Sequence, residues 1–347
     1  MKRFLANWKM AAGLLISLLF LFLAFRKVDF RQMLHAFGSV NYWYLFPAVA
    51  LIFLNHWLRA WRWRFLLKPI REIGTAPLFS ALLIGYMANT FLPAHLGELV
   101  RAYVIGKKKD VPSTAAFATI VVERIIDVLT LLALMALTFI VFPFPSWVKS
   151  SGYILLAGIL LLFIVLVLMK IHRARALKVV GSLLRPFSDR LRARVGQVLG
   201  SFLDGIVPLK KRSDYPVVAV LSLLIWLGYA LAFQILFQAF NFVATYALPW
   251  SAALVLLVIT TISVVVPSSP GYVGTYHYLC QISLGLFSVP KGIALSFAFV
   301  MHAVNFVPVL VVGLILVFTG GMNLRSLGKS AESTLEPEAA APAEPGR

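Results

Sequence analysis

The sequence predicts an all-α protein, a polytopic bundle of membrane helices. Of its 347 residues, 61% are hydrophobic and only 13% are charged, and the mean hydropathy is +0.89. A soluble domain carries about 45–50% apolar and about 25% charged residues, so the composition excludes an ordinary water-soluble enzyme. The net charge of +19 then marks cytoplasmic loops and contacts with anionic lipid. Nucleic acid is not expected as a partner.

The first two apolar runs define the orientation of the chain. Residues 11–25 follow a basic N-terminus and lack a small-residue cleavage site before Arg26, which indicates a retained first helix. The second run covers residues 42–58. It ends in a basic cluster made of Arg59, Arg62, Arg64, Lys68 and Arg71. The positive-inside rule places this cluster, and with it the N-terminus, in the cytoplasm.

A broken hairpin is predicted next. Two apolar pieces, residues 78–92 and 96–105, are separated by Pro93-Ala94-His95, and each is shorter than the roughly 20 residues that a membrane span needs. Basic clusters at both outer ends favour a re-entrant hairpin that opens to the cytoplasm. A long helix over residues 112–141 then crosses outward, and residues 153–169 cross back.

The segment 170–212 is the strongest orientation marker. It holds eleven Lys and Arg residues against two Asp, which predicts a cytoplasmic location. Within it, apolar residues recur at helical spacing. These residues are Leu191, Val195, Val198, Phe202 and Ile206. The pattern fits an amphipathic helix on the inner leaflet, or equally a cytosolic helix that packs on the ends of the bundle.

The second half repeats the arrangement in the opposite sense. A span over 216–240 crosses outward, and the last span over 292–318 returns, so both termini are expected in the cytoplasm. Between them, the short pieces 250–266 and 272–287 form a second hairpin that must open to the outside. Residues 1–329 are thus predicted as one transmembrane domain, with 330–347 as a disordered tail.

The predicted topology is six full spans plus two broken hairpins that enter from opposite faces. Such a pattern indicates an inverted repeat with a substrate site where the hairpins meet. The local sequences Pro93-x3-Gly97 and Pro270-x3-Gly274 correspond. Irregular backbone at membrane depth is tolerated next to protein or a water-filled cavity, so these residues and Gly271 are expected to line a cavity. Tight turns at the membrane surface are the alternative.

Charged residues inside the apolar runs are the candidate binding residues. Glu98 and Arg101 share a helix face and are expected to pair. Free N–H groups at the start of their helix, together with the Arg101 guanidinium, would suit the phosphate of an anionic lipid headgroup. A structural salt bridge near the interface is the alternative.

A second charged group lies in the long helix that follows. Glu123 and Asp127 stand four residues apart, and Arg124 is offset by one position. We expect one of these acids to pair with a base from another segment, with Arg101 as the obvious candidate. An interfacial role remains the alternative for this group.

The histidines give weaker signals. His277 follows Gly274 in the second hairpin, while His302 and Asn305 share a face of the last helix, where a hydrogen-bonded packing role is favoured for His302. Six scattered histidines and Cys280 do not form a metal-site pattern. No nucleophile motif or phosphate-binding glycine loop is found. We therefore predict no metal, no cofactor and no enzymatic activity.

Two signatures resemble one known family. The string LPAHLGELVRAYVIGKKKDVPSTAAFATIVVERIIDVLTLL, residues 92–132, is similar to the Leu-x4-Gly-Glu-x2-Arg … Glu-Arg-x2-Asp pattern of the lysylphosphatidylglycerol synthase transmembrane-region family, which is also described as flippase-like. PSSPGYVGTYHY, residues 267–278, resembles its second signature, Pro-Gly-Gly-x-Gly-x-x-Glu, with Tyr272 in place of the second Gly and His277 in place of Glu. The similarity spans nearly the whole chain.

The resemblance implies a lipid-translocating membrane module without the cytosolic aminoacyl-transfer domain of the best-known relatives. We therefore expect a translocator of lipids or lipid-linked intermediates in a bacterial inner membrane. Its partner would be an anionic phospholipid or a polyprenyl-phosphate-linked lipid, and no oligomeric state is predicted. The alternatives are a non-transporting accessory protein for a lipid- or glycan-synthesising enzyme, and a small-solute secondary transporter.

Overall fold

The computed structural model describes residues 2–92, 96–142, 146–186, 188–205, 208–265 and 270–322. Helices joined by short turns make up this part of the chain, and no β-strand occurs in it, so the predicted all-α class is confirmed. In the first half the elements are α1 Lys2–Phe25, α2 Phe30–Ser39, η1 Tyr42–Tyr44, α3 Leu45–Leu67, α4 Thr75–Phe91, α5 Gly97–Lys109, α6 Ser113–Val141 and α7 Ser146–Ile171. In the second half they are α8 Arg173–Leu183, α9 Asp189–Gly205, α10 Asp214–Ala239, α11 Phe242–Tyr246, α12 Ser251–Val265, η2 Pro270–Tyr272, α13 Thr275–Gly285 and α14 Lys291–Thr319.

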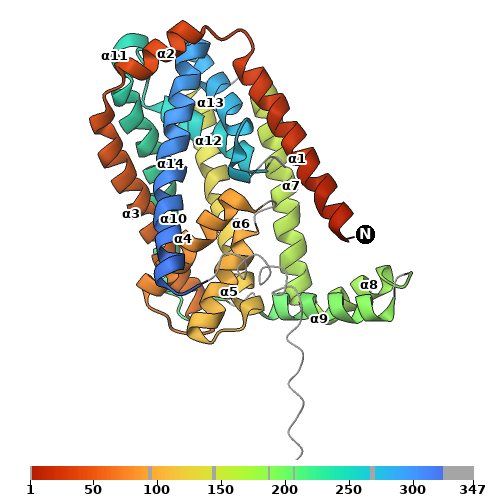
Figure 1. Ribbon diagram of the computed structural model, residues 1–347. Coiled ribbons are helices and arrows are strands. Elements are labelled where there is room, and N and C mark those ends of the chain that lie inside the picture. The colour runs from red at the N-terminus through yellow and green to blue at the C-terminus, as the bar shows by residue number, and fades with distance from the viewer. Residues whose placement is uncertain are drawn as a thin grey trace, which may run out of the picture.

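The long helices run along a common axis and form the body of the bundle (Figure 1). The α4–α5 hairpin lies toward one end, and the α12–α13 hairpin lies toward the other. Helices α8 and α9 lie across the end that also holds α5. The two hairpins therefore approach from opposite ends, as the predicted topology requires.

Two of the described helices are long and apolar enough to cross a membrane by themselves, namely α10 and α14. The segment from Phe30 to Leu67, bent by 70° between α2 and η1–α3, would make a third span. These assignments rest on length and composition within the described residues. The total of six spans remains a prediction.

Helix α2 is an element that the sequence reasoning missed. It has only ten residues, and it begins at a local signal: the Asp29 carboxylate accepts hydrogen bonds from the backbone N–H groups of Arg31 at 2.9 Å and Gln32 at 3.2 Å. A side chain that caps the first free amides in this way fixes a helix start. The helix packs against α14 and closes the end of the bundle opposite α5.

The apolar core is shared between α3, α10 and α14. Phe297 of α14 is fully buried, with its ring centroid 5.4 Å from the rings of both Phe237 on α10 and Phe242 on α11. Helices α3 and α10 approach closely where Gly228 faces the side chain of Asn55, because a Cβ at that glycine would overlap the amide. This packing holds α3 against α10. The polar face of α3 is thereby directed toward α6.

The α4–α5 hairpin depends on one glycine. A Cβ on Gly97 would overlap the carbonyl oxygen of Gly85 and the side chain of Asn89, so only glycine permits this approach of α5 to α4. The Gly97 N–H donates to Asn89 Oδ1 at 2.8 Å. Of the N–H groups expected to be free at the start of this helix, that of Gly97 is therefore not free, because it is bonded to Asn89. Pro93, predicted to line the cavity, lies outside the described residues.

The α12–α13 hairpin turns through left-handed backbone. Gly271 has φ 73° and Gly274 has φ 92°, which explains glycine at both positions. Tyr272 also adopts a positive φ of 58°. The family signature has glycine there, so the tyrosine stands in a conformation that side chains rarely adopt.

Helices α8 and α9 decide between the two arrangements expected for the basic segment 170–212. Helix α9 contacts α6 and α7, and the Lys170 ammonium donates to the carbonyl of the fully buried Leu203 at 2.6 Å. Helix α9 thus packs on the end of the bundle. Helix α8 has no buried residue and extends away from the bundle axis.

Candidate functional site

Two arginines of α3 form the floor of a buried charge cluster. Arg59 and Arg62 are spaced three apart and share one helix face, and they are 4% and 0% exposed. Both were predicted to belong to the basic cluster that follows the second apolar run, and the structure instead buries their side chains against α6 and α10. Helix α3 continues nine residues beyond Leu58, so this face stays against α6 and α10 while Arg64 is exposed.

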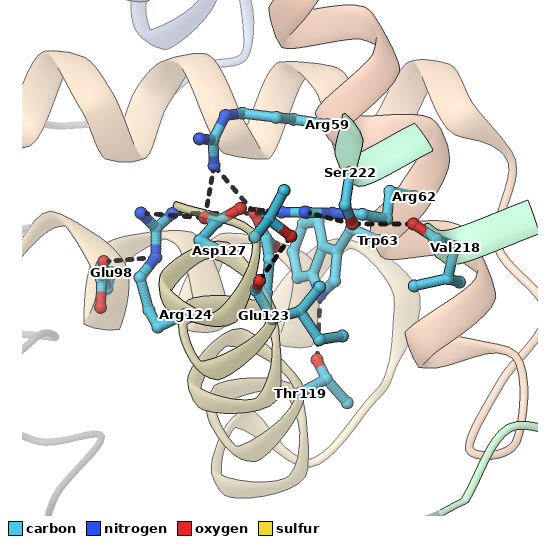
Figure 2. Close-up of polar contacts among 12 residues, drawn as sticks. Arg59, Arg62, Trp63, Glu98, Thr119, Glu123, Arg124, Asp127, Val218 and Ser222 are labelled. Carbon is cyan, nitrogen blue, oxygen red and sulfur yellow. Dashed lines mark hydrogen bonds and ion pairs between the residues drawn. The ribbon is translucent and has the colours of Figure 1, made fainter. Parts of the chain in front are cut away.

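The carboxylates of α6 lie directly opposite these arginines (Figure 2). Arg59 Nη1 lies 2.8 Å from Asp127 Oδ2 and 3.5 Å from Glu123 Oε1. Arg62 Nη2 lies 2.7 Å from Asp127 Oδ1 and 3.4 Å from Glu123 Oε1. Because Glu123 and Asp127 are one helical turn apart, both acids face α3 together, as their spacing predicted.

Two neutral hydroxyl groups of α10, those of Ser222 and Tyr229, also contact the two arginines. Arg62 Nη1 donates to Ser222 Oγ at 2.9 Å, and the Ser222 hydroxyl donates onward to the Val218 carbonyl at 2.7 Å. Arg59 Nε donates to the Tyr229 hydroxyl at 3.1 Å. Helix α10 therefore orients both guanidinium groups without adding a charge.

Arg101 connects the first hairpin to this cluster. Its Nη2 lies 2.7 Å from Glu123 Oε2, which confirms the expected pairing between an acid of the long helix and Arg101. The guanidinium also stacks 3.6 Å above the ring of Trp63, a cation–π contact in a desolvated position. The Trp63 indole N–H donates to Thr119 Oγ1 at 2.9 Å, so the ring itself is held in place.

Arg124 and Glu98 form the exposed edge of the cluster. Arg124 Nε lies 3.1 Å from Glu98 Oε1, so Glu98 pairs with Arg124 and not with Arg101 as expected. Arg124 also approaches Asp127 at 3.5 Å and Glu123 at 3.7 Å. Its side chain is 34% exposed and that of Glu98 is 20% exposed, in contrast to the buried members. Tyr272 of the second hairpin is within electrostatic reach of both.

The cluster carries an excess of positive charge. We call it the arginine network; its members are Arg59, Arg62, Arg101, Arg124, Glu98, Glu123 and Asp127. Four guanidinium groups thus face three carboxylates. Three nitrogens of the buried arginines have no hydrogen-bond acceptor among the described residues, namely Nε of Arg62 and Nε and Nη1 of Arg101. Buried donors normally find acceptors, so the network has capacity for an added anion.

The remaining predicted residues form a separate group. His302 Nε2 donates to the Gly271 carbonyl at 2.8 Å, and the His277 and His302 rings lie 4.9 Å apart. The Gly274 N–H donates to His277 Nδ1 at 3.3 Å. Pro270 starts the η2 turn, which contacts α4. These residues border α4 and α14, while the arginine network lies between α3, α5, α6 and α10.

A helical bundle with five buried ionisable side chains, and two more at the edge of their cluster, belongs to the class of polytopic membrane proteins with a polar centre. Buried ionisable groups in such bundles mark substrate or ion pathways. Within the described residues no group of three His, Cys, Asp or Glu side chains is placed to hold a metal ion.

Comparison with known proteins then identifies the family. Residues 10–313 match the family model described as the lysylphosphatidylglycerol synthase transmembrane region, so the chain belongs to this family. The expected resemblance is confirmed over most of the chain. No solved structure matches.

Three curated relatives are archaeal. A UPF0104 membrane protein of Methanocaldococcus jannaschii is 23% identical over 87% of this chain and 92% of its own length. A UPF0104 membrane protein of Methanothermobacter thermautotrophicus is 27% identical over 57% of this chain and 63% of its own. Glycosyltransferase AglD of Haloferax volcanii is 29% identical over 43% of this chain, and the match covers 24% of that protein.

Proposed function

We propose that the protein translocates a lipid or lipid-linked intermediate and that the arginine network binds its anionic headgroup. The observation that carries this proposal is the network's composition: four arginines against three acids, in the interior of a membrane bundle, with buried guanidinium nitrogens that lack acceptors. Guanidinium groups bind phosphate oxygens in bidentate fashion. An anionic phospholipid or a polyprenyl-phosphate-linked lipid supplies that charge.

Arg124 is the proposed first contact. It is the most exposed arginine of the network, and its present partner Glu98 belongs to the hairpin helix α5. A phosphate that approaches this edge would compete with Glu98 for the guanidinium. Arg101, whose Nε and Nη1 have no acceptor, would then take the second phosphate contact. Pro270, Gly271, Gly274 and His277 would line the path on the other side of α4.

The proposed location is a bacterial inner membrane. The end of the bundle that carries α5, α8 and α9 also carries the lysines at 107–109, and the positive-inside rule places that end in the cytoplasm. Both termini would then be cytoplasmic.

A vesicle assay tests the translocation directly. The purified chain is reconstituted into liposomes with nitrobenzoxadiazole-labelled phosphatidylglycerol, and dithionite reports the fraction of label that reaches the outer leaflet. We expect faster movement than in empty vesicles, and a reduction of about tenfold or more for Arg124→Gln. Arg64→Gln, an exposed arginine of α3, is the matched control and should retain the rate. If labelled phosphatidylglycerol and labelled polyprenyl phosphate both move as in empty vesicles while a known scramblase is active, the proposal is wrong.

A second candidate function is support of a membrane enzyme of glycan synthesis. Two observations favour it: the partial similarity to a glycosyltransferase, and the exposed helix α8 that extends sideways from the bundle. This function predicts that Arg124→Gln leaves activity in cells intact. Charge reversal at Arg175 and Lys178 on α8 should abolish that activity. A complementation assay with these variants separates the two candidates.

A further inference from the structure

A cavity of about 480 Å³ lies between the end of α1, helix α13 and the first residue of α14. Figure 1 places these elements at the end of the bundle opposite α5, α8 and α9. The volume falls within the range of small-ligand sites. No residue that lines the cavity belongs to the arginine network.

Three basic side chains line this cavity. Arg26 and Lys27 follow the last turn of α1, and Lys291 opens α14. All three are exposed, and none forms an ion pair with a described acid. The nearest acid in the chain, Asp29, uses its carboxylate to cap α2. The lining of the cavity therefore holds three cations and no carboxylate.

The position of these cations is not explained by membrane orientation. The positive-inside rule concentrates Lys and Arg at the cytoplasmic end, where α5, α8 and α9 lie, and depletes them at the other end. Arg26, Lys27 and Lys291 nevertheless gather at that other end around one cavity. Their presence at this end therefore needs another explanation, and a ligand with negative charge supplies one.

The cavity wall suits a molecule with an apolar part. Leu23, Tyr278 and Ile282 line it beside the cations. Gln281 is buried and donates from Nε2 to the Ala24 carbonyl at 2.9 Å and to the Lys291 carbonyl at 3.2 Å. This amide ties the end of α1 to the start of α14, and it thereby holds the basic residues around the cavity.

We propose that this cavity binds the phosphate group of an anionic lipid at the outer end of the bundle. The charge would be met by Arg26, Lys27 and Lys291, while the apolar wall contacts the glycerol and the first carbons of the acyl chains. A soluble phosphate ester shares the same chemistry and could use the same cations. The site extends the proposed function by adding a headgroup site at the end opposite the cytoplasmic one, but its binding does not require transport.

Binding of short-chain lipids to the purified full chain in detergent tests the proposal. Isothermal titration calorimetry compares dihexanoyl phosphatidylglycerol, dihexanoyl phosphatidylcholine and glycerol 3-phosphate. The triple variant R26Q/K27Q/K291Q removes the charge, and we expect about fivefold weaker binding of phosphatidylglycerol per charge, or about a hundredfold in total. The matched control, K210Q/K211Q/R212Q, removes one Arg and two Lys at exposed positions elsewhere and should bind within twofold of the native chain.

A second variant blocks the cavity without changing charge. A Cβ at Gly285 meets no atom within 4 Å, so Gly285→Leu extends into the cavity with little strain. We expect at least a tenfold loss of binding, whereas Gly158→Leu, an equally open glycine of α7, should leave it unchanged. This variant decides the matter if the triple variant fails to fold.

The outcomes separate cleanly. Glycerol 3-phosphate binding as tightly as the lipid assigns the site to soluble phosphate esters, and tenfold weaker binding assigns it to the lipid. Equal binding of phosphatidylglycerol and phosphatidylcholine, or no effect of either cavity variant, would overturn the proposal. Arg124→Gln should affect only binding at the arginine network, so the binding component that is lost in R26Q/K27Q/K291Q should persist in Arg124→Gln. If the native chain binds phosphatidylglycerol at the cavity but does not transport it in vesicles, only the proposed function is refuted. If it transports the lipid but the cavity variants do not affect binding, only the cavity site is refuted.

Discussion

Replacing Glu123 with Gln is the most direct test of the arginine network. The carboxylate is 0% exposed and lies within 4 Å of four guanidinium groups, the closest being Arg101 at 2.7 Å. Gln keeps the shape but removes the charge, so four arginines would face two acids. Two unit charges about 4 Å apart attract by about 4 kcal/mol at an effective dielectric constant of about 20. Loss of one partner of a buried pair costs about 3–5 kcal/mol.

We therefore expect Glu123→Gln to lower the free energy of unfolding by about 3–5 kcal/mol. Titration with sodium dodecyl sulfate, followed by tryptophan fluorescence, measures this change in the purified protein. Glu72→Gln is the control, because Glu72 pairs with Lys210 at 3.0 Å on the exposed surface, where an ion pair contributes little. Glu123→Gln/Arg101→Gln should recover part of the loss, since it removes the stranded cation. Equal unfolding curves for Glu123→Gln and Glu72→Gln would refute the reasoning.

Three further predictions concern packing, burial and topology. Gly97→Ala should lower the free energy of unfolding by about 1–3 kcal/mol, because the added Cβ overlaps backbone of α4, and the same detergent titration measures it. Arg62→Gln should cost about 3–5 kcal/mol and Arg64→Gln less than about 0.5 kcal/mol, since only the first arginine is buried; equal costs would contradict the assignment. Because the native cysteine is buried, an impermeant maleimide should label Leu183→Cys on α8 only from the cytoplasmic side and Leu34→Cys on α2 only from the other side of oriented vesicles.

The sequence predicted the helices well because apolar runs and proline breaks are local signals. The long helix expected over 112–141 is α6, Ser113–Val141, and the breaks near Pro93 and Pro270 each separate the two helices of one hairpin. Helix α2 was missed because its ten residues carry too little apolar character to stand out as a span. Its Asp29 cap is a signal that could have located it.

The candidate site was predicted in part. Helical spacing placed Glu123 and Asp127 on one face correctly, and it selected Arg101 as a partner. It failed for Glu98, because spacing within one helix does not show which neighbouring helix lies closest. Arg59 and Arg62 were assigned to the cytoplasmic charge because they follow an apolar run. Arg59 and Arg62 are three residues apart and share one helix face with Asn55. This spacing is the signal that could have indicated that both side chains are buried.

The attachment of α1 has a consequence for access from the bilayer. This helix packs against α13, and many of its side chains, such as Leu15 and Phe22, are exposed. Hydrogen bonds from Ser17 to the Val273 carbonyl and from Gln281 to the Ala24 carbonyl cross the seam. The seam between α3 and α10 is closed by hydrogen bonds from Arg59 to Tyr229 and from Arg62 to Ser222, and by the close contact of Gly228 with Asn55. For the lipid transport proposed above, displacement of α1 would admit an acyl chain from the bilayer beside the second hairpin without disturbing the arginine network.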